Sequence, residues 1–535
     1  MSDPVAEEQV FNQPPPFADV NLIAADTPLR EAAGLAAGEL LPFGAEWGAE
    51  ARLALGRHAN ENPPRLRTHD PQGRRLDLVE FHPAYHALMG HSHAAGLAHS
   101  TWAGGSHVAR AARLFVIAQV EAGHVCPLTM THAAPAALAA APTLLAEWLP
   151  RINAGPYDSR FVPFWEKSSV TLGMGMTEKQ GGTDVRANIT RAEAIGGDDY
   201  EITGHKWFFS APMSDAFLVL AQANGGLTCF LVPRFRPDGA VNALHLQRLK
   251  DKLGNRSNAS SEVEFARAFA WRVGAEGRGV ATIIEMVQLT RLDCAVSSAG
   301  LMRMALALAV HHARHRTVFG KRLIDQPAMT AVLADLALES EAATALAFRL
   351  ALSFDRAKDD PLEAARARLL TPAVKFSVCK AAPGFIYEAM EALGGNAYVE
   401  ESPLPRLYRE APVNAIWEGS GNVMALDLLR AAARDAAATR AVIAALAQEA
   451  REVPGALEAA RDIADSLTGD DLESRARHIA ERLAALAAAA ALASCAPGPV
   501  AHAFGTTRLM RPRALFGANP IAEPAWLLDR ALTEP

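Results

Sequence analysis

The chain has 535 residues, of which 50% are apolar and 21% are charged, and its formal net charge is −7. It is too long for one hydrophobic core, so several domains are expected. The composition excludes a disordered chain, and the acidic balance gives no general attraction to nucleic acid or to an anionic membrane. The five cysteines form no Cys-x-x-Cys pair, which argues against a zinc site or a disulfide framework and favours the reducing cytoplasm.

The N-terminal part of the sequence predicts an arm followed by a helical domain. Residues 1–45 are expected to form an extended arm with short helices, because the three prolines at 14–16 cannot lie inside a helix. The segment also lacks the apolar stretch of a signal peptide. From 46 to 169, apolar residues recur at three- and four-residue spacing, as in 83–98 and 108–122, and this spacing predicts an N-terminal α-domain.

The character of the sequence then changes from helical to strand-like. Residues 200–210, 216–220 and 227–233 contain the aromatic and β-branched side chains that strands favour. Residues 259–265 alternate between polar and apolar with period two. We therefore expect a β-domain at residues 170–277, inserted between helical regions.

Helical periodicity returns after the β-domain. Long amphipathic segments at 283–317, 329–355 and 362–393 predict a helical bundle at residues 278–436. Residues 437–535 are rich in alanine and predict an additional C-terminal helical domain. The longest apolar run in that last part is too short to cross a bilayer, so no membrane association is expected.

Two short blocks carry the clearest functional signal. One is Ile-Trp-Glu-Gly-Ser-Gly-Asn at 416–422, and the other is Met-Gly-Met-Thr-Glu-Lys-Gln-Gly-Gly-Thr-Asp-Val at 174–185. Small residues around a single carboxylate let a planar ligand approach the backbone closely. Both blocks resemble the acyl-CoA dehydrogenase family of flavoproteins, and the match is closer still to its AidB branch, the DNA-alkylation-response flavoproteins.

The resemblance covers about residues 75–435 and implies a fold. It is an α+β acyl-CoA dehydrogenase fold, with an N-terminal helical domain, a central β-domain and a C-terminal four-helix bundle, here extended by a further C-terminal helical domain. The resemblance also implies FAD as the cofactor, an acyl-CoA thioester as the substrate, and a homotetramer.

Glu418 is the candidate catalytic base, because it matches the family's catalytic glutamate in position and context. Removing hydrogen from Cα and Cβ of a thioester requires a base for the α-proton and an acceptor for the β-hydride. No side chain accepts hydride reversibly, so a redox cofactor is required. Burial beside an acyl chain and a flavin is expected to raise the pKa of Glu418. The alternative is a surface carboxylate in a loop before a helix.

The resemblance also assigns a set of residues to the flavin. They are Met174, Met176, Thr177, Thr183, Phe208, Phe209, Ser210, Arg316, Trp417, Gly419, Ser420, Gly421 and Asn422. Relatives usually have a tryptophan at the position of Phe208, and the neighbouring Trp207 leaves the register open by one residue. The alternative for Phe208 and Phe209 is an ordinary β-core. Arg316 resembles an arginine that reaches the flavin pyrophosphate of a neighbouring subunit, and the alternative is a solvated basic helix end.

Arg430 lies twelve residues after Glu418, about 18 Å along a helix. In AidB-like proteins an arginine at this place narrows the substrate channel, and an arginine at the bundle surface is the alternative. No metal site is expected, since His82, His86, His91 and His93 have no acidic partner at ligand spacing.

Two classes of function remain open from the sequence. The first is an FAD-dependent acyl-CoA dehydrogenase for a short or branched, isovaleryl-like acyl group. The second is an AidB-like flavoprotein that binds double-stranded DNA through its C-terminal domain. From residue 440 onward there are ten Arg, no Lys and twelve acidic residues, a net charge of −2 that weakens the second class. A flavin oxidase on the same fold is a third possibility.

Overall fold

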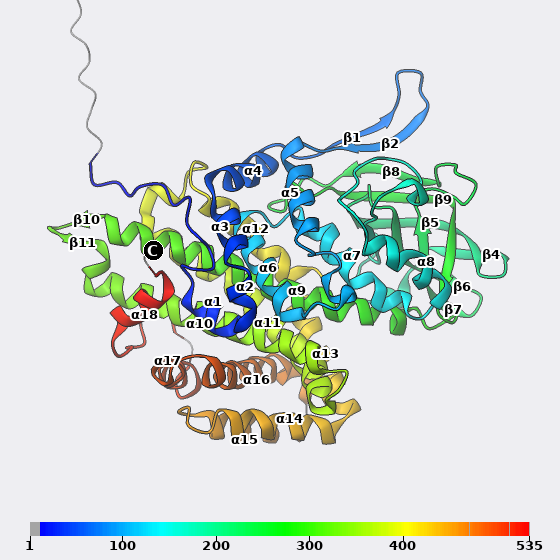
Figure 1. Cartoon of the computed structure of the whole chain (residues 1–535). Helices are drawn as coiled ribbons and strands as arrows, with labels where there is room; N and C mark the ends of the chain where they lie inside the picture. The colour runs from blue at the N-terminus through cyan, green and yellow to red at the C-terminus, as the bar shows by residue number, and fades with distance from the viewer. Residues whose placement is uncertain (1–10, 470, 513, 534–535) are drawn as a thin grey trace, which may run out of the picture.

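A computed structural model describes residues 11–469, 471–512 and 514–533. Figure 1 shows the β-domain on one side, the long bundle helices in the centre, and the C-terminal helices as a separate layer beneath the bundle. The acyl-CoA dehydrogenase fold predicted from the sequence, with its added helices, is confirmed.

The N-terminal region is mainly helical. Its helices are α1 (Thr27–Ala33), α2 (Leu35–Glu39), α3 (Leu41–Gly48), α4 (Glu50–Glu61), α5 (Pro83–Ala94), α6 (His107–Val120), α7 (Val125–Leu138) and α8 (Pro142–Ile152). A hairpin of β1 (Arg65–His69) and β2 (Arg75–Glu80) interrupts them and projects from the body in Figure 1. The expectation of helix throughout this stretch is wrong at the hairpin, whose residues alternate with period two but bury only one face.

The central domain is built on a seven-stranded sheet. Its strands are β3 (Leu172–Gly175), β4 (Arg191–Gly196), β5 (Asp199–Ser210), β6 (Ala216–Ala223), β7 (Gly226–Pro233), β8 (Leu244–Leu249) and β9 (Ser260–Val273). Six strands follow the order β3-β6-β4-β5-β9-β7, and β8 pairs with β9 off this path. A further pairing of β6 with β7 closes the sheet on itself. Inward-facing side chains, among them Phe217, Phe230 and Phe265, fill the interior.

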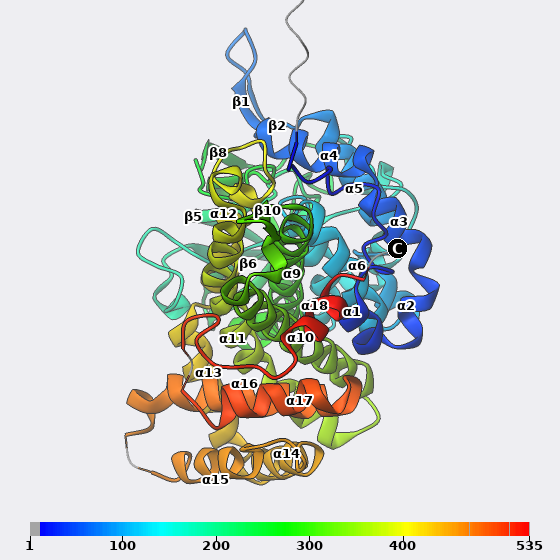
Figure 2. The ribbon, with the colours of Figure 1, turned by 90° about the vertical axis from the view of Figure 1, so that its left-hand side faces the viewer.

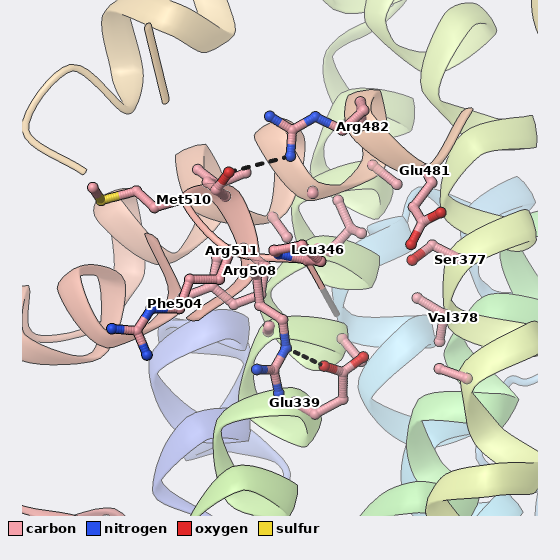
Figure 3. Close-up of a pocket in the computed structure, with 18 of the residues that line it drawn as sticks. Glu339, Leu346, Ser377, Val378, Glu481, Arg482, Phe504, Arg508, Met510 and Arg511 are labelled. Carbon is pink, nitrogen blue, oxygen red and sulfur yellow. Dashed lines mark hydrogen bonds and ion pairs between the residues drawn. The ribbon is translucent and has the colours of Figure 1, made fainter. Parts of the chain in front are cut away.

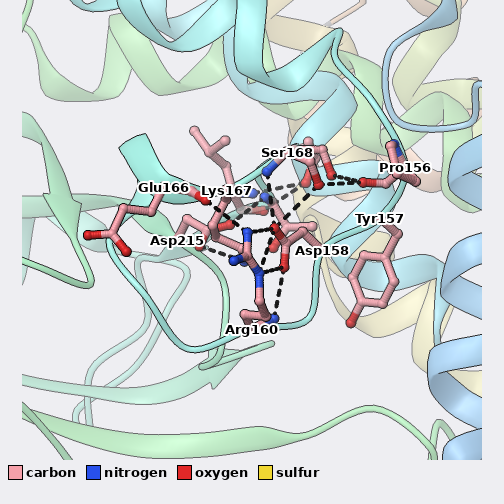
Figure 4. A network of polar contacts seen from close by, with 12 residues as sticks. Pro156, Tyr157, Asp158, Arg160, Glu166, Lys167, Ser168 and Asp215 are labelled. Carbon is pink, nitrogen blue, oxygen red and sulfur yellow. Dashed lines mark hydrogen bonds and ion pairs between the residues drawn. The ribbon is translucent and has the colours of Figure 1, made fainter.

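A polar network joins the N-terminal helices to the first strand of the sheet (Figure 4). Asp158 accepts hydrogen bonds from Arg160 and from the backbone N–H of Ser168, and these bonds lower the pKa of its carboxyl. Lys167 pairs with buried Asp215 at 2.8 Å, and Asp215 also accepts the N–H of Thr171. The network therefore fixes the backbone immediately before β3, which carries the first predicted flavin residues.

The bundle contains three very long helices, close to the three amphipathic segments expected from the sequence. Its elements are α9 (Gly279–His315), β10 (Thr317–Val318), β11 (Lys321–Arg322), α10 (Pro327–Arg356), α11 (Pro361–Leu393), α12 (Leu404–Ile416) and α13 (Gly421–Arg434). Most of α9 is buried, and a buried pair of Arg110 with Asp293 at 2.6 Å ties it to α6. Both α9 and a later helix, α16, are long and apolar enough to cross a membrane, but 89% and 61% of their apolar windows are buried inside the fold, as in core helices.

The C-terminal region adds a double layer of helices to the bundle. Its members are α14 (Ala436–Glu449), α15 (Ala456–Ser466), α16 (Leu472–Cys495), α17 (Gly498–Phe504) and α18 (Pro524–Ala531). Figure 2 shows α16 and α17 against the bundle and α14 and α15 as the outer layer. The chain then returns upward, and Arg530 on α18 pairs with Glu31 on α1 and with Glu341 on α10.

Candidate active site

Glu418 lies in the short connection between α12 and α13. Its backbone has a φ of +58°, and the next residue, Gly419, has a φ of +101°. A Cβ on Gly419 would lie 2.5 Å from the methyl carbon of Met424, so only glycine fits there. This turn directs Glu418 inward just before the first turn of α13.

Two bundle helices hold the turn in place. The hydroxyl of Thr290 on α9 donates to the Glu418 carboxylate at 2.9 Å, and the Nε of Arg291 donates to the Glu418 carbonyl at 3.0 Å. The buried Lys375 on α11 donates to the Gly419 carbonyl at 2.8 Å. None of these three residues was predicted from the sequence, because no local motif marks their contact with the distant Glu418 turn.

Burial raises the pKa of Glu418 above its ordinary value. The hydrogen bond from Thr290 and the charges of Arg291 and Lys375 oppose this rise without cancelling it. A carboxylate with a raised pKa is a stronger base near neutral pH than an exposed one. The position therefore has the electrostatics of a general base, as expected from the sequence.

Met174, Met176 and Trp417 converge on one apolar cluster between the N-terminal helices and the sheet. All three are partly exposed, while Gly173 and Gly175 alternate with the methionines and are buried. A Cβ on Gly175 would lie 2.6 Å from the ring of Phe209, which explains the glycine. Met174 and Met176 of the 174–185 block therefore pack against the same apolar cluster as Trp417, the residue directly before Glu418.

The loop after β3 is held by a fully buried ion pair. Lys206 donates to Glu178 at 2.7 Å, and both side chains are 0% exposed. Glu178 also accepts the N–H groups of Ile189 and Thr190, and together these bonds lower its pKa to about 2. This pair fixes Thr177 beside β5, whereas Thr183 lies on the exposed part of the loop.

A bulge in β5 decides how its three aromatic residues point. Lys206 pairs with Val263 but Phe209 pairs with Ser261, so Trp207 and Phe208 together oppose one residue of β9. Phe208 is 51% exposed, whereas Phe209 is fully buried in the interior of the sheet. Phe209 is therefore a core residue, whose ring packs against Phe217. Its assignment to the flavin was wrong, because a fully buried ring has no surface to offer a ligand.

Ser210 connects the sheet to the turn that precedes β9. Its hydroxyl lies 3.3 Å from that of Ser260, which accepts a hydrogen bond from Lys252 at 3.0 Å. Burial lowers the pKa of Lys252 to about 8, and the charge of Lys252 in turn acts on Cys126. Cys126 is also within electrostatic reach of Glu418. Lys252 is therefore joined to Ser210 through Ser260.

Arg316 is placed at the base of the β10–β11 hairpin. Its guanidinium donates to the carbonyl of Asn12 at 2.7 Å, and Asn12 makes two further hydrogen bonds with Thr317. Phe319, between the two strands, is 96% exposed. Figure 1 shows the β10–β11 hairpin projecting from the body of the molecule. Arg316 therefore contacts the N-terminal arm of its own chain, and its role toward the flavin of a neighbouring subunit stays a prediction.

The remaining residues of the 416–422 block lie at the start of α13. Ser420 is exposed, and a Cβ on Gly421 would meet Lys380 of α11 at 3.3 Å. Asn422 accepts a hydrogen bond from Arg477 of α16 at 3.3 Å. Arg430 is exposed on the surface of α13, which favours the surface alternative over a side chain inside a substrate channel.

A separate cavity of about 530 Å³ lies between the bundle and the C-terminal layer. Figure 3 shows Arg508 from the segment after α17 donating to Glu339 of α10, and Arg482 donating to the Leu509 carbonyl. Glu339 and Arg508 neutralise each other, and the cavity contains none of the predicted flavin residues. Over the residues the structure describes, no group of three or more His, Cys, Asp or Glu side chains is arranged to hold a metal ion.

The residues assigned to the flavin fit such a ring in their chemistry. Phe208 offers an exposed aromatic face, Met174 and Met176 offer polarizable apolar edges, and Ser210 offers a hydroxyl. The backbone at Gly182 lies close to Thr177, and a Cβ on Gly182 would lie 2.4 Å from the Thr177 hydroxyl. The loop therefore has little room for a side chain at this position. A flat, mostly apolar ring with polar edges suits this set of groups.

Comparison with known proteins agrees with this geometry. The adaptive response protein AidB N-terminal domain matches residues 12–159, and the middle and C-terminal domains of acyl-CoA dehydrogenase match residues 173–268 and 277–433. The putative acyl-CoA dehydrogenase AidB of Escherichia coli K12 is 53% identical over 431 residues, which is 79% of this chain and 80% of that protein. The chain belongs to the acyl-CoA dehydrogenase family.

Solved structures extend the comparison of this acyl-CoA dehydrogenase family member. The crystal structure of Caenorhabditis elegans ACDH-11 in complex with C11-CoA has a TM-score of 0.86 and 27% identity, and covers 96% of this chain and 95% of that one. An acyl-CoA dehydrogenase from Bacillus anthracis complexed with FAD has a TM-score of 0.63 at 17% identity, covers 77% and 76%, and shares the fold. The family uses FAD, so the cofactor expected from the sequence is confirmed.

Proposed function

We propose that this AidB-type protein is an FAD-dependent oxidoreductase that removes hydrogen from Cα and Cβ of a short or branched, isovaleryl-like acyl-CoA. The observation that carries the proposal is Glu418, a carboxylate with a raised pKa that Thr290 and Arg291 hold beside the cluster of Met174 and Trp417. A single base in an apolar setting, next to residues suited to a flavin, is what α,β-dehydrogenation of a thioester needs.

In the proposed reaction Glu418 takes the α-proton, and the acyl group loses two hydrogens to become the α,β-unsaturated thioester. FAD, when bound, supplies the acceptor for the β-hydride. The apolar side chains of Met174, Met176 and Trp417 exclude water from the carboxylate and so preserve its basicity. The N–H groups at the start of α13 provide a positive field next to the base, which favours the developing enolate oxygen.

A short or branched acyl group is favoured by the bulk of Trp417, which stands where relatives usually have a tyrosine. The indole is held by a hydrogen bond to Asn414 at 3.0 Å, so it cannot easily turn aside. The structure of the relative with C11-CoA makes a longer chain the main competitor. The substrate series in the test must therefore run from four to at least eleven carbons.

The test is an anaerobic titration of the purified, FAD-loaded protein with acyl-CoA thioesters. Bleaching of the flavin absorbance by a short or branched thioester is expected, and Glu418→Gln should slow it by about 10²–10⁴-fold. Glu401→Gln, an exposed carboxylate nearby in sequence, is the matched control and should bleach like the wild type. If no thioester bleaches the wild-type flavin, the dehydrogenase proposal is wrong.

Binding of double-stranded DNA through the C-terminal domain is the second candidate. It is supported by the match to the AidB N-terminal domain and by Arg475 and Arg477, which are exposed near the start of α16. Arg508 supports it less, because this arginine is buried in ion pairs with Asp335 and Glu339. Arg513 lies outside the described residues.

Electrophoretic retardation of a duplex at several salt concentrations tests this candidate. Retardation should weaken with salt and should fall in a variant with both Arg475→Ala and Arg477→Ala, with Arg430→Ala measured alongside. Arg451→Ala, at the turn between α14 and α15, serves as a control for general charge. A duplex that is not retarded even at low salt would contradict this candidate.

We also propose that the protein is a cytoplasmic homotetramer. Phe319 at the tip of the β10–β11 hairpin is almost fully exposed, and Tyr387, Tyr398 and Tyr408 form further exposed aromatic surface on α11 and α12 and between them. Large exposed aromatic residues of this kind mark association surfaces. Light scattering on the wild type should give about four times the chain mass of 57.0 kDa, and Phe319→Ser should lower it.

A further inference from the structure

A groove on the outer face of the C-terminal layer has no part in the proposed flavin site. It encloses about 660 Å³ between the end of α13, the helix α14 and the helix α15. Figures 1 and 2 place α14 and α15 on the side of the molecule that faces away from the bundle and the β-domain. The volume lies in the range of small-molecule sites in proteins.

The walls of the groove are apolar and unusually small. Alanines from all three helices are the commonest lining residues, seven of seventeen, with Ile443 buried and Leu457 at the rim, 44% exposed. The outer face of a surface helix is normally polar, and its buried face meets the rest of the fold. Helices α14 and α15 pack on α16. The groove combines buried residues of these helices, such as Ile443, with exposed alanines such as Ala444 and Ala464, so part of this outer surface is apolar.

Two guanidinium groups stand in this mainly apolar wall, which also contains Thr439, Thr468 and Asp465. Arg440 lies in the second turn of α14, and Arg461 lies on the facing helix α15. Within the described part of the chain, neither arginine makes an ion pair of 4.0 Å or less, and Asp465 is the acidic residue that shares the groove with them. The net charge of the lining is therefore positive.

We propose that this groove binds a free fatty acid, with the aliphatic chain along the alanines of α14 and α15 and the carboxylate at Arg440 and Arg461. A linear chain matches a narrow groove with small side chains, and the fork of a guanidinium matches a carboxylate. A polar ligand would have polar groups without partners in these walls. An aromatic ligand would be wider than a linear aliphatic chain. The site is separate from Glu418 and does not depend on the proposed dehydrogenase activity.

The test uses the full-length, FAD-loaded protein and the fluorescent fatty acid cis-parinarate. Saturable binding is expected, with displacement by laurate at least roughly tenfold better than by 1-dodecanol, which has the same chain length but no carboxylate. Ala444→Trp and Ala464→Trp, which fill the groove from opposite helices, should each weaken binding by about tenfold or more. Arg440→Ala and Arg461→Ala should each weaken laurate binding by about tenfold and leave 1-dodecanol unchanged.

Arg451→Ala is the control, since this exposed arginine lies between the same two helices but outside the groove. Laurate that binds in the groove should leave the flavin absorbance unchanged. A change in the absorbance would mean that laurate enters near Glu418 instead. The proposal is overturned if the two tryptophan variants bind cis-parinarate as the wild type does. It is also overturned if no saturable binding occurs and Ala444→Trp instead lowers the oligomer mass, because the groove then holds a second copy of the chain.

Discussion

Thr290 donates a hydrogen bond to the carboxylate of Glu418 at 2.9 Å, from a helix 128 residues earlier in the chain. This bond stabilises the charged form of the carboxyl and so lowers its pKa, against the rise that burial causes. The neighbouring Arg291 holds the carbonyl of the same glutamate. Helix α9 therefore sets both the position and the proton affinity of the proposed base.

Thr290→Val should shift the acidic limb of the kcat/KM profile to higher pH. The base acts only when deprotonated, and loss of the hydrogen bond removes an interaction that lowers the pKa of Glu418, so that pKa rises further. On the acidic limb kcat/KM should fall by about tenfold, while the alkaline plateau changes little. Stopped-flow bleaching across pH measures this shift, with Thr290→Ser as the variant that keeps the bond. An acidic limb that moves to lower pH would contradict the assignment.

Phe208 and Phe209 are adjacent in sequence and should respond in opposite ways to truncation. Phe209→Ala removes a fully buried ring and should lower the free energy of unfolding by about 3–5 kcal/mol. Phe208→Ala removes a ring that is 51% exposed, so stability should change by less than about 1 kcal/mol while FAD is held less tightly. Thermal unfolding and the fluorescence of released flavin separate the two effects. Equal stability losses would contradict the bulge in β5.

Phe208 and Phe209 also show which features of the fold could be predicted from the sequence and which could not. The long helices were predictable because 3.6-residue periodicity continues for about thirty residues in α9, α10 and α11. The two functional blocks were predictable because their residues are contiguous. The orientation of Phe209 was not, since the bulge that turns Phe208 outward depends on pairing with β9, more than fifty residues later.

Contacts between distant single residues were equally invisible in the sequence. Thr290 and Lys375 contact the Glu418 turn from helices 128 and 44 residues earlier in the chain, and no local pattern indicates those contacts. The β1–β2 hairpin was missed because its short alternating strands lie within a helical region. Arg430 illustrates the reverse case, because spacing along a helix gave its distance from Glu418 but not the face on which it lies.

Lys206→Met should strongly destabilise the protein, because it leaves Glu178 as a buried charge without its partner. Breaking a buried pair from one side costs about 3–5 kcal/mol. Adding Glu178→Gln should recover part of this loss, since the double variant buries no net charge. Glu178 has a lowered pKa, so in the wild type its contribution is present above the unfolded pKa and is lost as the pH falls toward about 2. Denaturant unfolding of both variants at neutral and acidic pH measures this, and a double variant less stable than Lys206→Met would contradict it.

Arg477 connects the added C-terminal layer to the start of α13. Its guanidinium donates to Asn422 at 3.3 Å and lies over the ring of Phe376, 5.7 Å from the centroid. Asn422 follows the Glu418 turn by four residues, so the contact steadies the turn that the flavin is proposed to meet. Arg477→Ala should therefore weaken FAD retention by about fivefold, the effect of one modest hydrogen bond, with little change in unfolding temperature.

The matched control for Arg477 is Arg475→Ala. Arg475 lies on the same exposed turn of α16, but it donates to Ser466 within the C-terminal layer itself. Its removal should leave FAD retention unchanged, whereas Arg477→Lys should restore part of what Arg477→Ala loses, because a cation over Phe376 is kept. Equilibrium dialysis with FAD, followed by flavin fluorescence, gives the dissociation constants. If both alanine variants lose FAD equally, the effect belongs to the general stability of α16, and the specific contact with Asn422 does not support the flavin site.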